Sequence, residues 1–198
     1  FMVLLTTHLL GMESRGEIST IMLAVGIIHL VSDLAGGPSL VYLVPRAQLS
    51  RLLLSCTAWS VVATFTTAYI LLHTGRIPAQ YFTEVLIIGI LISLHSLNQN
   101  ILLGQERIRA YNILFLFQGV VMFATFCVAV FLFHRNQSYP YIYSCMAGYG
   151  LSYLSGLYLV NRRRTTTHFN ESRPVLLLLF MNGFYTQAAS LGLNLAKS

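Results

Sequence analysis

The sequence predicts an all-α fold, a polytopic bundle of about six to seven transmembrane helices. Hydrophobic residues make up 56% of the 198 positions and charged residues only 9%, whereas a soluble domain carries about 25% charged residues. The apolar runs, such as "FLFQGVVMFATFCVAVFLF" from Phe115, are much longer than the roughly ten alternating residues of a barrel strand. Lipid is therefore the expected solvent for most of the chain.

Each run of about 20 mostly apolar residues predicts one transmembrane helix. The sequence contains five such spans and a partial span at each end: Phe1–Leu10 (partial), Ile18–Val44, Leu49–Leu72, Tyr81–Leu103, Ile108–Phe133, Tyr139–Val160, and a partial span that begins at Val175. We expect residues 1–174 to form one N-terminal bundle and residues 175–198 to begin a second. Both ends of the chain fall inside apolar runs, which is typical of a fragment of a longer protein.

The second span, Ile18–Val44, contains an aspartate and a helix breaker. A carboxylate at a helix centre costs about 2.5–3.5 kcal/mol, and the eight branched aliphatic residues before Asp33 together contribute only about 2.4–4.8 kcal/mol. Pro38 has no N–H and frees the carbonyl of Leu34. Broken backbone at this depth is stable only against protein or water. We therefore expect the span to bend or unwind near Gly36–Pro38 and to face the interior of the bundle.

Polar side chains in three spans are candidates for a common interior site. His29 and Asp33 are four residues apart and share one helix face. This pattern fits an interhelical hydrogen-bonded pair or a proton or cation site, and it supplies too few ligands for a metal. "SLHSLNQN" in the fourth span includes His95 and Asn98, and Gln118 lies in the fifth. These groups either surround one polar cavity with Asp33 or form ordinary hydrogen bonds between helices.

Small residues recur at steps of four along the sixth span: Ser144, Gly148, Ser152 and Gly156. On a helix they form one flat stripe, which predicts close packing against a neighbouring helix. We assign this stripe no chemistry.

Basic residues predict the orientation of the bundle. Eight of the twelve follow the second, fourth and sixth spans: Arg46, Arg51, Arg107, Arg109, Arg162, Arg163, Arg164 and Arg173. The positive-inside rule places that side, and with it the N-terminus, in the cytoplasm. Because these arginines lie in short clusters between apolar runs, we do not expect nucleic-acid binding. The sequence also contains no catalytic or nucleotide-binding motif, so we expect neither an enzyme nor a cofactor.

Four segments resemble a known family of membrane transporters. "SDLAGGPSLVYLVPR", Ser32–Arg46, resembles the second-span motif of polysaccharide flippases of the lipopolysaccharide O-antigen type. "LLGMESRGEIS", Leu9–Ser19, resembles the first loop of that family, and Leu102–Gln118 resembles the turn into its fifth span. Asn182–Ser198 resembles its seventh span, although relatives continue with Leu-Asn-x-Arg where this chain has Leu-Asn-Leu-Ala-Lys. The segments cover nearly the whole chain in order.

The resemblance implies the multidrug/oligosaccharidyl-lipid/polysaccharide exporter superfamily. Its members pair two six-helix bundles across a central cavity and export by alternating access in the bacterial inner membrane. This chain would be the first bundle and the start of the second, in contact with membrane lipids. The cargo implied is an oligosaccharide linked to polyprenyl pyrophosphate. The alternative within the superfamily is a multidrug antiporter coupled to a proton or sodium ion, with Asp33 as the ion site.

Substrate binding would fall to the polar and basic groups of this first bundle. The candidates are Arg46, Arg107, Arg109, Asp33, His95, Asn98 and Gln118. A guanidinium offers a planar fork of donors that matches phosphate oxygens. The competing interpretation is that arginine after a span is an ordinary cytoplasmic anchor, and the sequence leaves both open.

Overall fold

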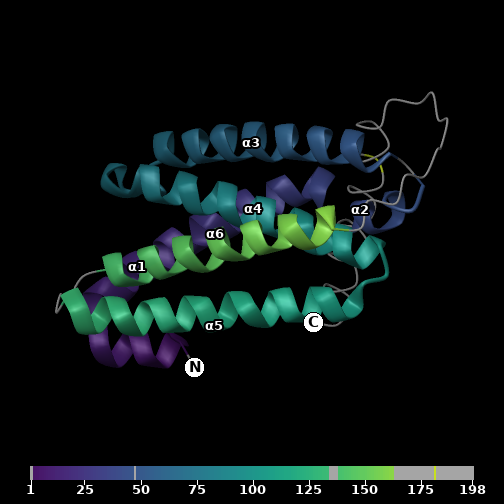
Figure 1. Ribbon diagram of the computed structural model, residues 1–198. Helices are drawn as coiled ribbons and strands as arrows, with labels where there is room; N and C mark the ends of the chain where they lie inside the picture. The colour runs from purple at the N-terminus through teal and green to yellow at the C-terminus, as the bar shows by residue number, and fades with distance from the viewer. Residues whose placement is uncertain (1, 47, 134–137, 163–180, 182–198) are drawn as a thin grey trace, which may run out of the picture.

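The computed structural model describes residues 2–46, 48–133, 138–162 and 181 (Figure 1). These residues are almost entirely helical, and no strand occurs among them. The elements are α1 (Met2–Gly36), α2 (Pro38–Leu43), α3 (Leu49–His73), the 3-10 turn η1 (Ala79–Tyr81), α4 (Phe82–Gly104), α5 (Ile108–Phe133) and α6 (Tyr139–Asn161). The predicted all-α class is confirmed.

Four helical segments of the described residues are long and apolar enough to cross a membrane: Ser14–Leu43, Leu49–His73, Ala79–Gly104 and Ile108–Phe131. They correspond to the second to fifth predicted spans. The sixth predicted span forms α6, which is 23 residues long but is not among the four, since tyrosine, serine and glycine replace many of its aliphatic residues. The span predicted from Val175 lies outside the described residues.

The start of the chain differs from the prediction. A partial span, a loop and a second span were expected, but α1 continues as one helix from Met2 to Gly36, and Figure 1 shows its ribbon bending within its N-terminal third. The buried positions explain the continuity, because they follow each other at steps of four and three as far back as residue 14. They are Ser14, Ile18, Ile21, Val25, Ile28, Ser32 and Ala35. This spacing marks one helix face, which extends through the polar stretch taken for a loop.

The predicted break in the second span is confirmed at Gly37, which separates α1 from α2. Pro38 is the first residue of α2, a position where its missing N–H costs nothing. The Gly37 N–H donates to the Asp33 carbonyl at 2.9 Å. A Cβ atom on Gly37 would lie 2.7 Å from that same oxygen, so the close approach at the break requires glycine.

Helix α4 is central and contacts every other helix, with α3 on one side and α5 on the other (Figure 1). The small-residue stripe of α6 packs as predicted. A Cβ atom on Gly148 would lie 2.9 Å from Met122 Cβ on α5, and one on Gly156 would lie 2.9 Å from Asn98 Nδ2 on α4. The two glycines therefore let the α6 backbone contact Met122 on α5 and the side chain of Asn98 on α4.

Helix α5 is the least covered of the four membrane-length helices, with 22% of its most apolar window buried. Large apolar side chains are exposed along it, namely Ile108, Ile113, Phe115, Leu116, Phe117, Val120, Phe123, Val128 and Phe131. In a membrane-spanning chain this surface faces acyl chains or another helix.

Candidate functional site: a polar interior and an arginine-rich end

Asp33 lies at the contact between α1 and α4. Ser96 Oγ donates a hydrogen bond to Asp33 Oδ1 at 3.3 Å. His29 Nε2 lies 3.7 Å from Asp33 Oδ2 one turn earlier on α1, as their spacing predicts. Both side chains are about one quarter exposed, so the carboxylate is partly enclosed between the helices. It faces polar groups of the bundle, as we expected for the second span.

Side chains of two neighbouring helices bind the carbonyls that the helix break leaves free. The thiol of Cys56 on α3 donates to the Ala35 carbonyl at 3.3 Å. Asn100 Nδ2 on α4 donates to the Gly36 carbonyl at 3.1 Å. In hydrocarbon an unpaired carbonyl costs several kcal/mol, so these contacts make the break stable within a membrane-length segment. The second contact accounts for Asn100, one of the polar residues of "SLHSLNQN".

The other polar residues of α4 face away from Asp33. His95 is buried with its ring centroid 5.9 Å from that of Tyr149 on α6, and Gln118 on α5 lies against both residues. Asn98 donates to the Tyr153 carbonyl at 3.1 Å and packs on α6. The predicted interior candidates therefore divide between two faces of α4, one toward α1 and one toward α5 and α6.

His29 connects these two faces, because it lies near enough to interact electrostatically with His95 as well as with Asp33. We call these polar side chains of α1, α4 and α5, namely His29, Asp33, His95 and Gln118, the polar path. Chemically it offers a carboxylate, two imidazoles and an amide group. Such groups can bind a proton or small cation, or hydrogen-bond a polar solute.

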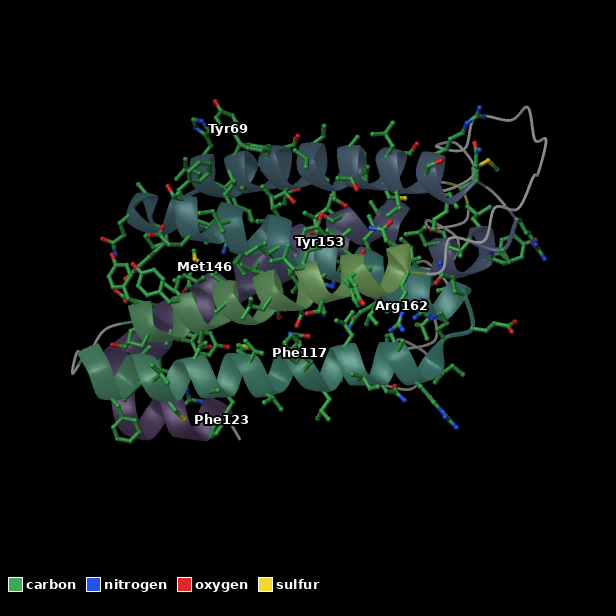
Figure 2. The ribbon with its side chains drawn as sticks, in the orientation of Figure 1. Tyr69, Phe117, Phe123, Met146, Tyr153 and Arg162 are labelled. Carbon is green, nitrogen blue, oxygen red and sulfur yellow. The ribbon has the colours of Figure 1, made fainter. Side chains whose placement is uncertain are left out.

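The predicted basic candidates lie at one end of the bundle, where α2, α4 and α6 finish and α5 begins. Figure 2 shows Arg162 at this end and Tyr69 near the other. Arg46 is exposed and stacks on Tyr42, with its guanidinium carbon 3.6 Å from the ring centroid. Arg107 is half-buried, and its Nη1 donates to the Leu159 carbonyl at 2.6 Å.

An open pocket of about 780 Å³ lies beside the turn between α4 and α5. Its lining is Glu106, Arg107, Ile108, Arg109, Ala110 and Arg162. Two of the predicted candidates, Arg107 and Arg109, line it, whereas Arg46 does not. Sequence reasoning missed Arg162 as a member, since only the fold brings the end of α6 to this turn.

A second polar cluster, at the opposite end, was not predicted. Tyr81 OH donates to Glu17 Oε2 at 2.8 Å, and Ser138 Oγ donates to the same oxygen. The two hydroxyls are 3.2 Å apart. Because these residues come from the middle of α1, the end of η1 and the N-cap of α6, one carboxylate joins three helical elements. The burial of Ser14 and Ile18 beside it on α1 is visible only in the structure, so the sequence offered no signal for this cluster.

The bundle thus combines a polar path through its interior with basic charge at one end and a carboxylate cluster at the other. Comparison with known proteins gives no match: no family model matches the sequence, and no curated protein or solved structure is significantly similar to it.

Proposed function

We propose that the chain belongs to a membrane exporter that carries a polyprenyl-pyrophosphate-linked oligosaccharide across the bacterial cytoplasmic membrane by alternating access. The observation that carries the proposal is the broken segment α1–α2. It faces polar groups of α4 inside membrane-length helices, and it leads directly to Arg46. Interrupted helices form the substrate sites of many transporters, and the break provides a place where the segment can bend.

The geometry of Arg46 supports a role in meeting the cargo. Stacking on Tyr42 uses the flat face of the guanidinium and leaves its in-plane N–H groups available. Those are the donors that bind phosphate oxygens two at a time. Arg107 and Arg109 add positive potential at the same end, which attracts an anionic head group.

The arginines at this end also predict the orientation of the bundle in the membrane. The positive-inside rule puts the end with Arg46, Arg107 and Arg162 in the cytoplasm. Labelling single cysteines in the full-length protein with an impermeant reagent tests this. We expect a cysteine at position 162 to react only after the cells are opened, and strong labelling in intact cells would reverse the proposed orientation.

Restoration of surface polysaccharide in a flippase-deficient strain tests the function, with the full-length protein and membrane levels checked by immunoblot. We expect Arg46→Lys to lose most of the restoration, because lysine keeps the charge without the planar fork. Arg51→Lys, an exposed arginine at the start of α3, is the matched control and should restore fully. Full restoration by both Arg46→Lys and Arg46→Gln at equal protein level would exclude the phosphate role.

A second candidate function, a cation-coupled multidrug antiporter, is favoured by one observation. Asp33 has a hydroxyl donor on one oxygen and an imidazole near the other, an arrangement that can release and rebind a proton. In this case Asp33→Asn should abolish dye efflux by the full-length protein and leave its membrane level unchanged. Dye efflux equal to that of the unsubstituted protein would exclude Asp33 as the coupling site.

A further inference from the structure

We propose that the pocket at the α4–α5 turn binds the head group of an anionic membrane phospholipid that stays with the protein. This site is distinct from the polar path, and its occupant is distinct from the cargo. The pocket supplies donors for a phosphate, net positive charge, and an adjoining apolar surface for acyl chains.

The first feature is the start of α5. The Tyr111 N–H donates to the Arg107 carbonyl at 3.0 Å, so the N–H groups of Ile108, Arg109 and Ala110 precede the first bond within the helix. All three residues line the pocket. N–H groups at the beginning of a 26-residue helix, together with the helix dipole, favour an anion.

The second feature is the set of arginines. Arg109 and Arg162 are exposed, come from different helices and line the same pocket. Within the described part of the chain, neither forms an ion pair with a carboxylate. Glu106 also lines the pocket, so three arginines and one glutamate leave a net charge of 3 − 1 = +2, which matches an anionic lipid rather than a zwitterionic one.

Arg107 has a structural role in the pocket, because its guanidinium is already hydrogen-bonded within the protein. Its Nη1 donates to the Leu159 carbonyl near the end of α6 and lies 3.4 Å from Gln105 Oε1. This contact holds the end of α6 beside the start of α5 and so brings Arg162 to Arg109. Both residues therefore line one pocket although they come from different helices.

The third feature selects a lipid. Ile108 lines the pocket and is 61% exposed, and it begins the apolar surface that runs along α5. A phosphate bound at the first turn of a membrane-length helix lies at the lipid head-group level, with its acyl chains beside that surface. Basic pockets between helices on the cytoplasmic side bind anionic head groups for this reason. None of the lining residues belongs to α1 or α2, the segments that carry Asp33 and Arg46.

The test uses the purified full-length protein in detergent and two lipids with the same acyl chains, phosphatidylglycerol and phosphatidylcholine. We expect phosphatidylglycerol to raise the melting temperature in a saturable way and to remain bound in native mass spectrometry, and phosphatidylcholine to do neither. The double variant Arg109→Gln/Arg162→Gln should bind phosphatidylglycerol about 30-fold more weakly. Arg51→Gln, at the same end but outside the pocket, should bind it normally.

Three outcomes would overturn the inference. Equal effects of the two lipids would mean that the pocket does not select charge. Unchanged phosphatidylglycerol binding in the double variant would place the lipid elsewhere. Displacement of bound lipid by inorganic pyrophosphate would assign the pocket to a soluble or cargo phosphate. None of these measurements involves transport. Failure of the proposed transport function would therefore not contradict the lipid site, and absence of lipid binding would not contradict the transport function.

Discussion

The two ends of the bundle differ in how their charged side chains are bound. At one end the carboxylate of Glu17 in α1 is bound by the hydroxyls of Tyr81 and Ser138, so that three helical elements meet at that single oxygen. At the other end Arg46, Arg109 and Arg162 are exposed, and none of the arginines there forms an ion pair within the described part of the chain.

The carboxylate at one end is bound within the protein, whereas the arginines at the other end have no carboxylate partner among the described residues. A carboxylate satisfied by the protein itself fixes the positions of helices, and it needs nothing from outside. Exposed guanidiniums that have no carboxylate partner keep N–H donors that an arriving anion can bind. The Glu17 end therefore fixes the positions of helices, and the arginine end is suited to binding an anionic ligand.

The sharpest way to break the comparison is to remove one glutamate from each end. Glu17→Ala should destabilise the protein by about 3 kcal/mol, because two hydrogen bonds to a charged group are lost and two buried hydroxyls remain. Glu106→Ala removes an exposed carboxylate that forms no ion pair among the described residues, and it should leave stability unchanged. Unfolding of each purified variant in a denaturing detergent measures both. Equal effects would show that the ends do not differ in this way.

Backbone packing is expected to be tight at the arginine end despite its free charges. A Cβ atom on Gly104 would lie 2.7 Å from Val44 Cβ and 3.1 Å from the Val41 carbonyl of α2. Gly104→Ala should therefore cost about 1–3 kcal/mol through overpacking. Gly119→Ala is the matched control, since nothing lies within 4 Å of its added methyl group. The same unfolding measurement applies, and a harmless Gly104→Ala would mean that α2 moves freely at this end.

A double-mutant cycle sharpens the account of the Glu17 end. Tyr81→Phe and Ser138→Ala each remove one hydroxyl from the shared carboxylate, and the two hydroxyls also contact each other. We expect a coupling energy of about 0.5–1.5 kcal/mol, from unfolding of the two single variants and the double variant. Strict additivity would indicate that the two hydroxyls bind Glu17 independently.

Much of the fold follows from the sequence because apolar length and helix breakers are local signals. The helices α3 to α6 and the break at Gly37 needed only composition and the position of Pro38, although α6 is not among the membrane-length segments. The small-residue stripe gave a packing face, and the structure shows α4 and α5 against it. The loop expected before Ile18 was wrong: the polar residues of that stretch are typical of a loop, and the burial of Ser14 on the same helix face as Ile18 is visible only in the structure.

The candidate site was less predictable, because it depends on which helix faces which. Asp33 and Ser96 were both singled out as polar residues, but only the packing of α1 on α4 makes them partners. Asn98 has the same residue type as Asn100, yet it faces α6, since two positions along a helix point to different sides. The Glu17 cluster joins residues 121 apart in sequence, and no local pattern reports such a contact.

The smallest expected effect compares the helix ends themselves. Helices α3 and α4 finish in the same way: Arg76 N–H donates to the Leu71 carbonyl, and Arg107 N–H to the Leu102 carbonyl, each over five residues. This motif needs a left-handed residue just before the arginine. At the Glu17 end that residue is Gly75 with φ 68°, and at the arginine end it is Glu106 with φ 56°.

A side chain in that conformation costs about 1–2 kcal/mol, and glycine costs about 0.5–1 kcal/mol more chain entropy on folding. Glu106→Gly should therefore stabilise the protein by about 0.5–1 kcal/mol, and Gly75→Ala should destabilise it by a similar amount. Because Glu106→Gly also removes the one carboxylate of the pocket, it should strengthen phosphatidylglycerol binding, whereas Gly75→Ala should leave that binding unchanged. Unfolding and lipid titration of the two variants measure both effects. A loss of stability in Glu106→Gly would mean that the glutamate side chain makes a stabilising contact at the turn. The carboxylate of Glu106 would then bind the neighbouring arginines, and the two ends of the bundle would not differ.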